Sequence, residues 1–158
     1  MVTVLNEIED AMRRLRLGQD DIALVPDEAG RVIVSALESH FVTTPGRRWW
    51  WEDFCFSTTS IHFLDQRGFT RIPIVVPDPD ERVWFVVEET LLPSYPVYES
   101  TPRVVEQVIG ECYGFEYYVV AKDLRWLVCE NHHNCIIAIG TEVESRLRGA
   151  APNPPQAP

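Results

Sequence analysis

The run Arg82–Glu89 constrains the fold most, because its apolar residues occupy both alternating sets of positions. Positions 83, 85 and 87 are Val, Phe and Val, and positions 84 and 86 are Trp and Val. Alternate side chains of a strand point to opposite faces of its sheet. A strand that is apolar on both faces is typical of a sheet centre covered on both sides. We therefore expect layers packed against both faces of a sheet.

Two amphipathic segments precede this strand. Apolar residues at positions 5, 8, 12 and 15 have helical spacing, with charged residues between them. Asn6 followed by Glu9 is typical of a capping box, and Gly18 is a helix-stop signal. A second helix is expected to begin at Pro26 and to end before the segment 43–46, Thr-Thr-Pro-Gly.

Short strand-like runs follow, separated by turn signals. The run Phe54–Phe63 changes the parity of its apolar residues, which predicts a bulge or two separate pieces. The run Thr70–Val76 alternates, and Pro73 within it favours an edge strand because proline cannot donate to a ladder. Leu91–Tyr98, with two prolines, is expected to be a crossing loop.

The second half begins with a helix signal at Ser100–Pro102 and a helix end at Gly114. Three strands are then expected: Phe115–Ala121, Arg125–Cys129 and Cys135–Ile139. The pattern also allows a short helix over 141–147. No strand–helix–strand unit repeats, so the pattern predicts the α+β class. We expect a mainly antiparallel sheet of about six strands, two N-terminal helices and one helix between two three-strand groups. Residues 1–147 would form one domain, and the proline-rich residues 148–158 a disordered tail.

The charge of the chain limits its partners. It carries 24 acidic and 14 basic residues, a formal net charge of −10. Phosphate binding requires a basic surface, so we expect no direct contact with nucleic acid. Residues 49–121 hold 12 acids and 4 bases, which concentrates the imbalance in the middle third. This is either an ordinary soluble surface or a docking face that selects a basic protein by complementary charge.

Two tyrosines accompany these acids. Tyr95 and Tyr98 fall in the expected loop, beside Glu88, Glu89 and Glu99. Tyrosine anchors surrounded by charged side chains are common in protein interfaces. We therefore expect these five residues to contact a basic partner protein.

The segment Cys129–Cys135 holds two thiols and two imidazoles within seven residues. Zinc binds Cys and His tetrahedrally, but adjacent histidines in a short loop rarely point to one centre, so we expect no metal and no other cofactor. The simplest interpretation is a structural hairpin in which Cys129 and Cys135 lie opposite each other as small buried thiols. The alternative is a polar binding or catalytic loop, formed by Glu130, Asn131, His132 and His133.

Signals for catalysis are otherwise weak. Cys112 lies on the apolar stripe of a helix, so packing explains it better than a role as a nucleophile. The chain contains no G-x-S-x-G, H-E-x-x-H, P-loop or G-x-G-x-x-G sequence. The adjacent acids at 52–53 and 88–89 would point to opposite faces of a strand, so neither pair is a ready dyad. We lean towards a protein that is not an enzyme.

Three consecutive tryptophans, at positions 49–51, form an unusual cluster. We expect one or two to cap the core where the second helix meets the sheet, and one to line the surface. Arg47 and Arg48 could stack on these rings or pair with Glu52 and Asp53. A stacking platform for a carbohydrate or a base is the functional alternative.

Cytoplasm is the expected compartment. The first 18 residues lack the apolar core of a signal peptide, and no apolar run approaches the roughly 20 residues that cross a bilayer. The four cysteines are sparse and irregularly spaced, unlike those of a secreted disulfide scaffold.

Two stretches carry a family resemblance: E-Y-Y-V-V at 116–120 and W-L-V-C-E-N-H-H at 126–133. They resemble a group of small uncharacterised bacterial proteins that share this signature. The layout of an acidic α+β chain with N-terminal helices is also similar to that of SMI1/KNR4-like proteins, many of which neutralise toxins as immunity proteins. That second resemblance implies a binding function without a cofactor.

Three functional hypotheses follow. The first is a non-catalytic cytosolic binding protein, most concretely an immunity protein that neutralises a basic toxin through an acidic surface. The second is a small enzyme or a ligand- or metal-binding domain that uses the loop between Cys129 and Cys135. The third is a scaffold component of a larger assembly, which the sequence alone does not separate from the first.

Overall fold

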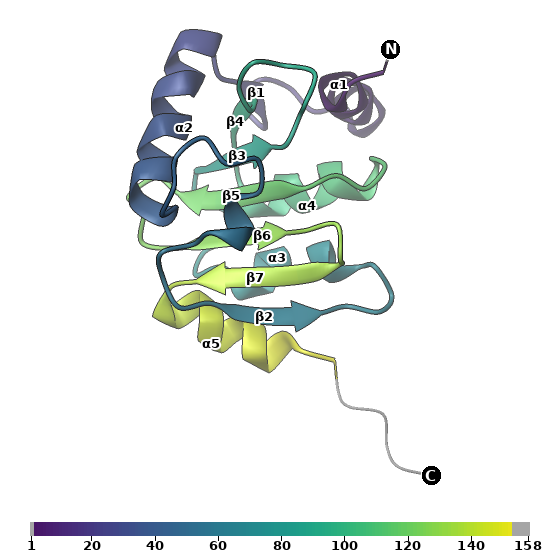
Figure 1. The fold of residues 1–158 in the computed structure, drawn as a ribbon. Helices are drawn as coiled ribbons and strands as arrows, with labels where there is room; N and C mark the ends of the chain where they lie inside the picture. Colours follow the sequence, from purple (N-terminus) through teal and green to yellow (C-terminus); the bar gives the residue numbers. More distant parts are fainter. Residues whose placement is uncertain (1, 153–158) are drawn as a thin grey trace.

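The computed structural model describes residues 2–152. Over these residues the chain forms five α-helices, two short 3-10 helices and seven strands (Figure 1). In chain order they are α1 (Val4–Leu15), β1 (Ala23–Leu24), α2 (Asp27–Phe41), η1 (Trp50–Glu52), β2 (Thr59–His62), η2 (Gly68–Arg71), α3 (Ile72–Val75), β3 (Val83–Val87), β4 (Val97–Ser100), α4 (Pro102–Gly110), β5 (Tyr117–Ala121), β6 (Leu127–Glu130), β7 (Cys135–Ile139) and α5 (Thr141–Ala150).

All seven strands form one antiparallel sheet in the order β1-β4-β3-β5-β6-β7-β2. The predicted α+β class and mainly antiparallel sheet are confirmed. β3, the strand expected to be central, has hydrogen-bonded neighbours on both sides, β4 and β5. The two short strands β1 and β2 lie at the edges.

Two hydrophobic cores cover the two faces of the sheet, as the pattern of β3 predicts. Val83, Phe85 and Val87 pack into the core under α1, α3, α4 and α5. Val86 packs into the other core, under α2 and η1. In Figure 1, α2 and η1 lie in front of the sheet, whereas α3 and α4 lie behind it. The long strands in the middle therefore contribute side chains to both cores.

Two predictions about strands are wrong. The run Thr70–Val76 is no edge strand: it forms η2 and α3, with Pro73 in the first turn of α3. Proline fits there because the first turn of a helix needs no intrahelical N–H, and Ile72, Val75 and Val76 also have helical spacing. The expected loop Leu91–Tyr98 runs into a strand, β4, which places Tyr98 inside the sheet.

Several element ends were placed correctly and others were not. The capping box of α1 pairs Thr3 with Asn6, not Asn6 with Glu9, because the hydroxyl of Thr3 accepts from the Asn6 amide and the Asn6 side chain accepts from the Thr3 amide. Arg16, in the left-handed region at φ 58°, ends α1 before Gly18 is reached. α2 begins at Asp27 and α4 follows the Thr101 cap, as expected.

The run Phe54–Phe63 splits into two pieces, which was one of the two predicted outcomes. Only Thr59–His62 forms a ladder, and Phe54 pairs with Val42 in an isolated bridge. At the other end of the chain, α5 continues to Ala150, past the expected domain boundary at residue 147. Residues 153–158 of the expected tail lie outside the described residues. Within residues 2–152, no helix combines the length and the apolar character that crossing a membrane requires.

Candidate functional site

Two glutamates lie side by side at one end of the sheet. The register pairs Val87 of β3 with Tyr117 of β5, and the next backbone bond joins the Glu88 amide to the Glu116 carbonyl at 3.0 Å. Val86 lies two residues before Glu88 and Tyr118 lies two residues after Glu116, and both pack into the core under α2. Because side chains alternate along a strand, Glu88 and Glu116 belong to this same face. On this face of the sheet, the two carboxyl groups therefore lie next to the apolar side chains of Val86 and Tyr118.

The two carboxyl groups are buried and incompletely bonded. Each residue is only 8% exposed. Within the part of the chain that the structure describes, Oε2 of Glu88 and Oε2 of Glu116 are buried and have no hydrogen-bond partner outside the pair. Burial and the neighbouring Glu116 raise the pKa of Glu88 to about 7. Burial alone would raise the pKa of Glu116, but a side-chain hydrogen bond from Glu88 and then hydrogen bonds from His132 hold it below its usual value. The two carboxyl groups therefore share one proton, assigned to Glu88, below about pH 7.

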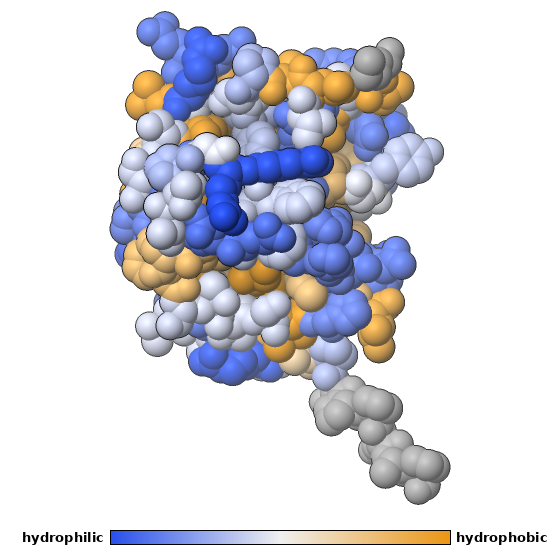
Figure 2. All heavy atoms as spheres, in the orientation of Figure 1, coloured by the Kyte–Doolittle hydropathy of each residue, from blue (hydrophilic) through white to orange (hydrophobic). Residues whose placement is uncertain are grey.

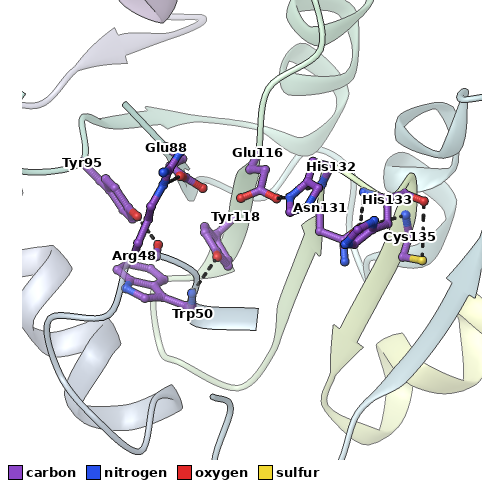
Figure 3. A network of polar contacts seen from close by, with 10 residues as sticks. All are labelled: Arg48, Trp50, Glu88, Tyr95, Glu116, Tyr118, Asn131, His132, His133 and Cys135. Atoms are coloured by element: carbon purple, nitrogen blue, oxygen red, sulfur yellow. Dashed lines mark hydrogen bonds and ion pairs between the residues drawn. The ribbon is translucent and has the colours of Figure 1, made fainter. Parts of the chain in front are cut away.

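The other oxygen of each carboxyl group is engaged. Oε1 of Glu88 accepts a hydrogen bond of 2.7 Å from Nε of Arg48. Oε1 of Glu116 accepts from the backbone amide of His132 at 2.8 Å, and Nδ1 of the His132 ring lies 2.5 Å away. An ionised carboxylate only accepts, so Nδ1 carries a proton, and in the neutral form of the ring the lone pair is on Nε2. Figure 3 shows the two contacts, Arg48 to Glu88 and His132 to Glu116.

The tryptophan segment, residues 49–51, packs beside Glu88, Glu116 and His132. Trp50 is fully buried in the core, and its backbone amide donates to the hydroxyl of Tyr118 at 3.1 Å. Trp49 is half-buried and its ring centroid lies 5.3 Å from that of His132. The guanidinium of Arg48 lies 5.0 Å from the Trp49 ring centroid. Trp50 therefore lies in the core under α2, as the sequence predicts, whereas the half-buried Trp49 forms part of the wall of the site.

The site opens into a cavity of about 400 Å³. Its wall combines acids, one guanidinium, one imidazole and aromatic rings: Val4, Arg48, Trp49, Glu88, Glu89, Thr90, Phe115, Glu116 and His132. A second cavity of about 340 Å³ shares Arg48, Glu89 and Thr90 with the first and extends towards Tyr95. The face that includes η1, shown in Figure 2, carries strongly hydrophilic side chains over its centre. Arg48 thus lies between two adjoining hollows.

Of the five residues predicted to contact a partner, three lie at this site and two do not. Glu88 lines the first cavity, Glu89 lines both, and Tyr95 lines the second. Glu89 also has a structural role, since its carboxylate accepts from the amides of Val4 and Leu91 at 2.9 and 3.0 Å. The hydroxyl of Tyr95 donates to the Arg48 carbonyl.

Tyr98 and Glu99 lie elsewhere, on β4. Tyr98 is 3% exposed within the core on the opposite face, so the expectation of a surface tyrosine is wrong. Glu99 is half-exposed and forms ion pairs with Arg82 and Lys122 at 3.2 and 3.1 Å. Other acids of the middle third also have ion partners, as Asp80 has in Arg103 and Glu111 in Arg14. Part of the expected open acidic surface is therefore buried or neutralised locally.

The loop between β6 and β7 divides into structural and accessible residues. Glu130 is half-buried and accepts from the hydroxyl of Tyr117 at 2.7 Å, and burial raises its pKa. Asn131 is buried, and its side-chain oxygen accepts from the amides of His133 and Cys135, which closes the turn. His132 and His133 are exposed, with ring centroids 4.0 Å apart.

The two cysteines of this loop do not face each other. Cys129 pairs with Ile137 across the ladder, not with Cys135, so that expectation is wrong. Burial raises the pKa of the Cys129 thiol, which disfavours the nucleophilic thiolate. Among residues 2–152, no three His, Cys, Asp or Glu side chains are grouped so that they could hold a metal ion.

Three residues of the site were not identified from the sequence as members of it: Arg48, Trp49 and Glu116. Arg47 approaches Asp53, at 3.7 Å, and Arg48 lies over the Trp49 ring, both as expected, but the ion partner of Arg48 is the distant Glu88. The sequence does carry a signal for Glu116, because the apolar series of β3 is followed directly by Glu88 and that of β5 is preceded directly by Glu116. Only the strand register, which no local pattern supplies, brings the two glutamates together.

Comparison with known proteins places the chain in a family. A family model described as a family of unknown function, DUF6756, matches residues 2–151. The chain belongs to this family. DUF6756 membership agrees with the expected uncharacterised family, although it does not test the E-Y-Y and W-L-V-C-E-N-H-H signature or the likeness to SMI1/KNR4-like proteins. No curated protein and no solved structure matches the chain significantly.

Proposed function

We propose that this DUF6756 chain is a non-catalytic cytosolic binding protein of the immunity type, which neutralises a basic toxin by protein–protein contact. The observation that carries the proposal is the pair of buried carboxyl groups beside an accessible cavity, whose Oε2 atoms receive no hydrogen bond from any other described group. Two adjacent buried carboxyl groups are costly to ionise together, and a partner that supplies a cationic donor would stabilise both in their ionised form. The proposed contact is therefore a small acidic hollow rather than a broad acidic face.

The surroundings of the hollow support a protein partner. Trp49 and Tyr95 are aromatic side chains at its margins, and aromatic residues are enriched at the centres of interfaces. Leu91 and Leu92 are exposed in the adjoining loop and would add apolar contact area. The net charge of −10 would speed the approach of a basic protein.

Affinity capture from the native host, followed by a neutralisation assay, tests this proposal. We expect one basic protein to be captured, to be toxic when expressed alone, and to be harmless when this chain is co-expressed. E88Q and E116Q should weaken the complex at least tenfold, whereas the distant E142Q should not, because Glu142 is exposed on α5. Added salt should weaken it further. If host cells that lack the gene keep full resistance to every toxin of their own strain, the proposal fails.

A second candidate is favoured by the contact between Glu116 and His132. The Glu116 carboxylate accepts the Nδ1 proton of His132, so in the neutral ring Nε2 can act as a general base. Arg48, nearby, could bind an anionic group of a substrate. The chain would then be a small enzyme or ligand-binding domain that uses the loop containing His132. A screen for ester and phosphoester hydrolysis tests this candidate. H132Q should abolish the activity, whereas H62Q, on the edge strand β2, should retain it.

A further inference from the structure

We infer that the cavity beside Glu88 and Glu116 accepts a single primary ammonium group, the side chain of a lysine from the partner protein. This inference rests on the proposed function, since it identifies which chemical group of a basic partner enters the hollow. It is carried by the contacts of the two carboxyl groups, shown in Figure 3, and by the residues that line the cavity.

The number of free acceptors fits a compact cation. Arg48 occupies Oε1 of Glu88, and His132 occupies Oε1 of Glu116 twice, through its amide and its ring. The other oxygen of each carboxyl group, Oε2, is buried and accepts from no other described residue. When Glu88 is protonated the two groups share its proton, and an entering cation would take the place of that proton. An ammonium group has three donors and no preferred plane, so it can bridge two oxygens that belong to different carboxylates.

A guanidinium group fits the same place less well. Its strength comes from two parallel hydrogen bonds to both oxygens of one carboxylate. Neither Glu88 nor Glu116 has two free oxygens, because each has already given Oε1 to a neighbour. Arg48 also places one guanidinium at the entrance, and a second would be repelled by it. The site therefore discriminates in favour of lysine over arginine.

The cavity also suits the four methylene groups of a lysine. Val4, Trp49 and Phe115 line it beside the carboxyl groups. A lysine stem commonly lies along apolar surface while its charged end reaches a polar group. Trp49 would contact the stem, so its fluorescence and ring resonances should report occupancy.

Binding of an ammonium should release a proton. Without a cation, the pair retains one proton near pH 7, on Glu88. The charged and titratable groups that face this carboxyl group are Arg48, Tyr95 and Glu116. A bound ammonium favours both carboxylates in their ionised form, so the proton leaves as the cation enters. Below pH 7 the affinity should thus rise up to about tenfold per pH unit, and above pH 7 it should level off.

Titration of the whole chain with small amines tests the inference. The probes are n-butylamine, n-butylguanidine and 1-butanol, followed by the NMR resonances of Trp49 and His132 at pH 5.5, 6.5 and 7.5. We expect butylamine to bind at least tenfold more tightly than butylguanidine, and butanol not to bind. Between pH 5.5 and 6.5 the butylamine affinity should rise severalfold.

Two variants supply the controls. E88Q keeps the shape of the protonated carboxyl group but cannot ionise, so it should weaken butylamine binding at least tenfold and remove its pH dependence. E99Q alters an acid of β4 that lies outside the cavity wall, so butylamine binding should be unchanged. Equal affinity for the amine and the guanidine, or no amine-dependent shift in the wild-type chain, overturns the inference.

The two proposals fail separately. If a toxin is captured and its binding depends on Glu88, but its arginines rather than its lysines are required, the lysine inference is wrong and the binding function stands. If butylamine binds as expected but resistance to toxins does not depend on the gene, the immunity function is wrong and the ammonium site stands.

Discussion

Glu88 is the residue whose ionisation most directly links the structure to pH. Its carboxyl group is buried against a second carboxyl group and against one guanidinium, and its pKa rises to about 7. Asp80 has the opposite environment, because its exposed carboxylate accepts from Arg103, which lowers its pKa. The pKa of an acidic side chain in this fold thus depends on whether burial and a second carboxyl group or an exposed cation dominate its surroundings.

Stability should fall as the pH rises through the pKa of Glu88. The folded chain holds a proton on Glu88 that the unfolded chain, with an ordinary pKa near 4.5, has already lost at pH 6. The contribution of this group is complete below pH 4.5 and disappears above about pH 7, a change on the order of 2 kcal/mol. Urea unfolding of the wild type and E88Q at pH 5, 6, 7 and 8 checks this. The difference in stability between them should shift towards E88Q with rising pH; a constant difference would contradict the assignment.

At the scale of elements, helix and strand ends decide where the polar residues of the fold lie. Thr101 caps α4, and its hydroxyl accepts from the Val104 amide at 3.3 Å. Gly140 joins β7 to α5 with φ 117°, a region that favours glycine. The sequence predicts only one of these two ends. The Thr101–Pro102 signal predicts the start of α4. The junction at Gly140 instead depends on its close approach to Arg125 and Trp126, which are not its neighbours in sequence.

Removal of the α4 cap should cost about 1 kcal/mol. T101A leaves the Val104 amide without its side-chain acceptor, and loss of an N-cap oxygen typically has this effect. Thermal unfolding followed by circular dichroism measures it, with T58A on an exposed segment as the matched threonine control. Equal melting temperatures for T101A and T58A would argue against the cap.

G140A should cost more, about 2 kcal/mol. A Cβ at this position would lie 2.9 Å from the carbonyl oxygen of Arg125 and 3.0 Å from Cβ of Trp126, and the backbone conformation is strained for alanine. Gly114 is the control, because a Cβ there meets nothing within 4 Å. Chemical denaturation of both variants should show a clear loss for G140A and little change for G114A; comparable losses would contradict the tight junction.

At the scale of the whole molecule, periodicity predicted the layers but not the site. The doubly apolar run of β3 led to a sheet covered on both faces, and the helices α1, α2 and α4 followed from spacing and caps. The run Thr70–Val76 fits both the strand and the helical period, so only packing against α4 and α5 decides between them. Glu116 and Arg48 join Glu88 through strand register and a long loop, which local patterns do not encode.

The two cores should unfold together, because the same strands supply both. β3, β5 and β6 direct alternate side chains into each core, so loss of one layer exposes the opposite face of the sheet. L37A removes a buried side chain from the core under α2 and should cost about 3 kcal/mol. Trp50 reports on that core and Trp126 on the other.

For L37A, tryptophan fluorescence and far-ultraviolet circular dichroism should therefore give one coincident urea transition at a lower midpoint than in the wild type. V108A, in the core under α4, is the matched substitution and should also shift both signals together. If L37A instead separates the fluorescence transition from the loss of secondary structure, the layer that carries Arg48 and Trp49 unfolds on its own. In that case binding to the carboxyl pair could be regulated without unfolding the sheet.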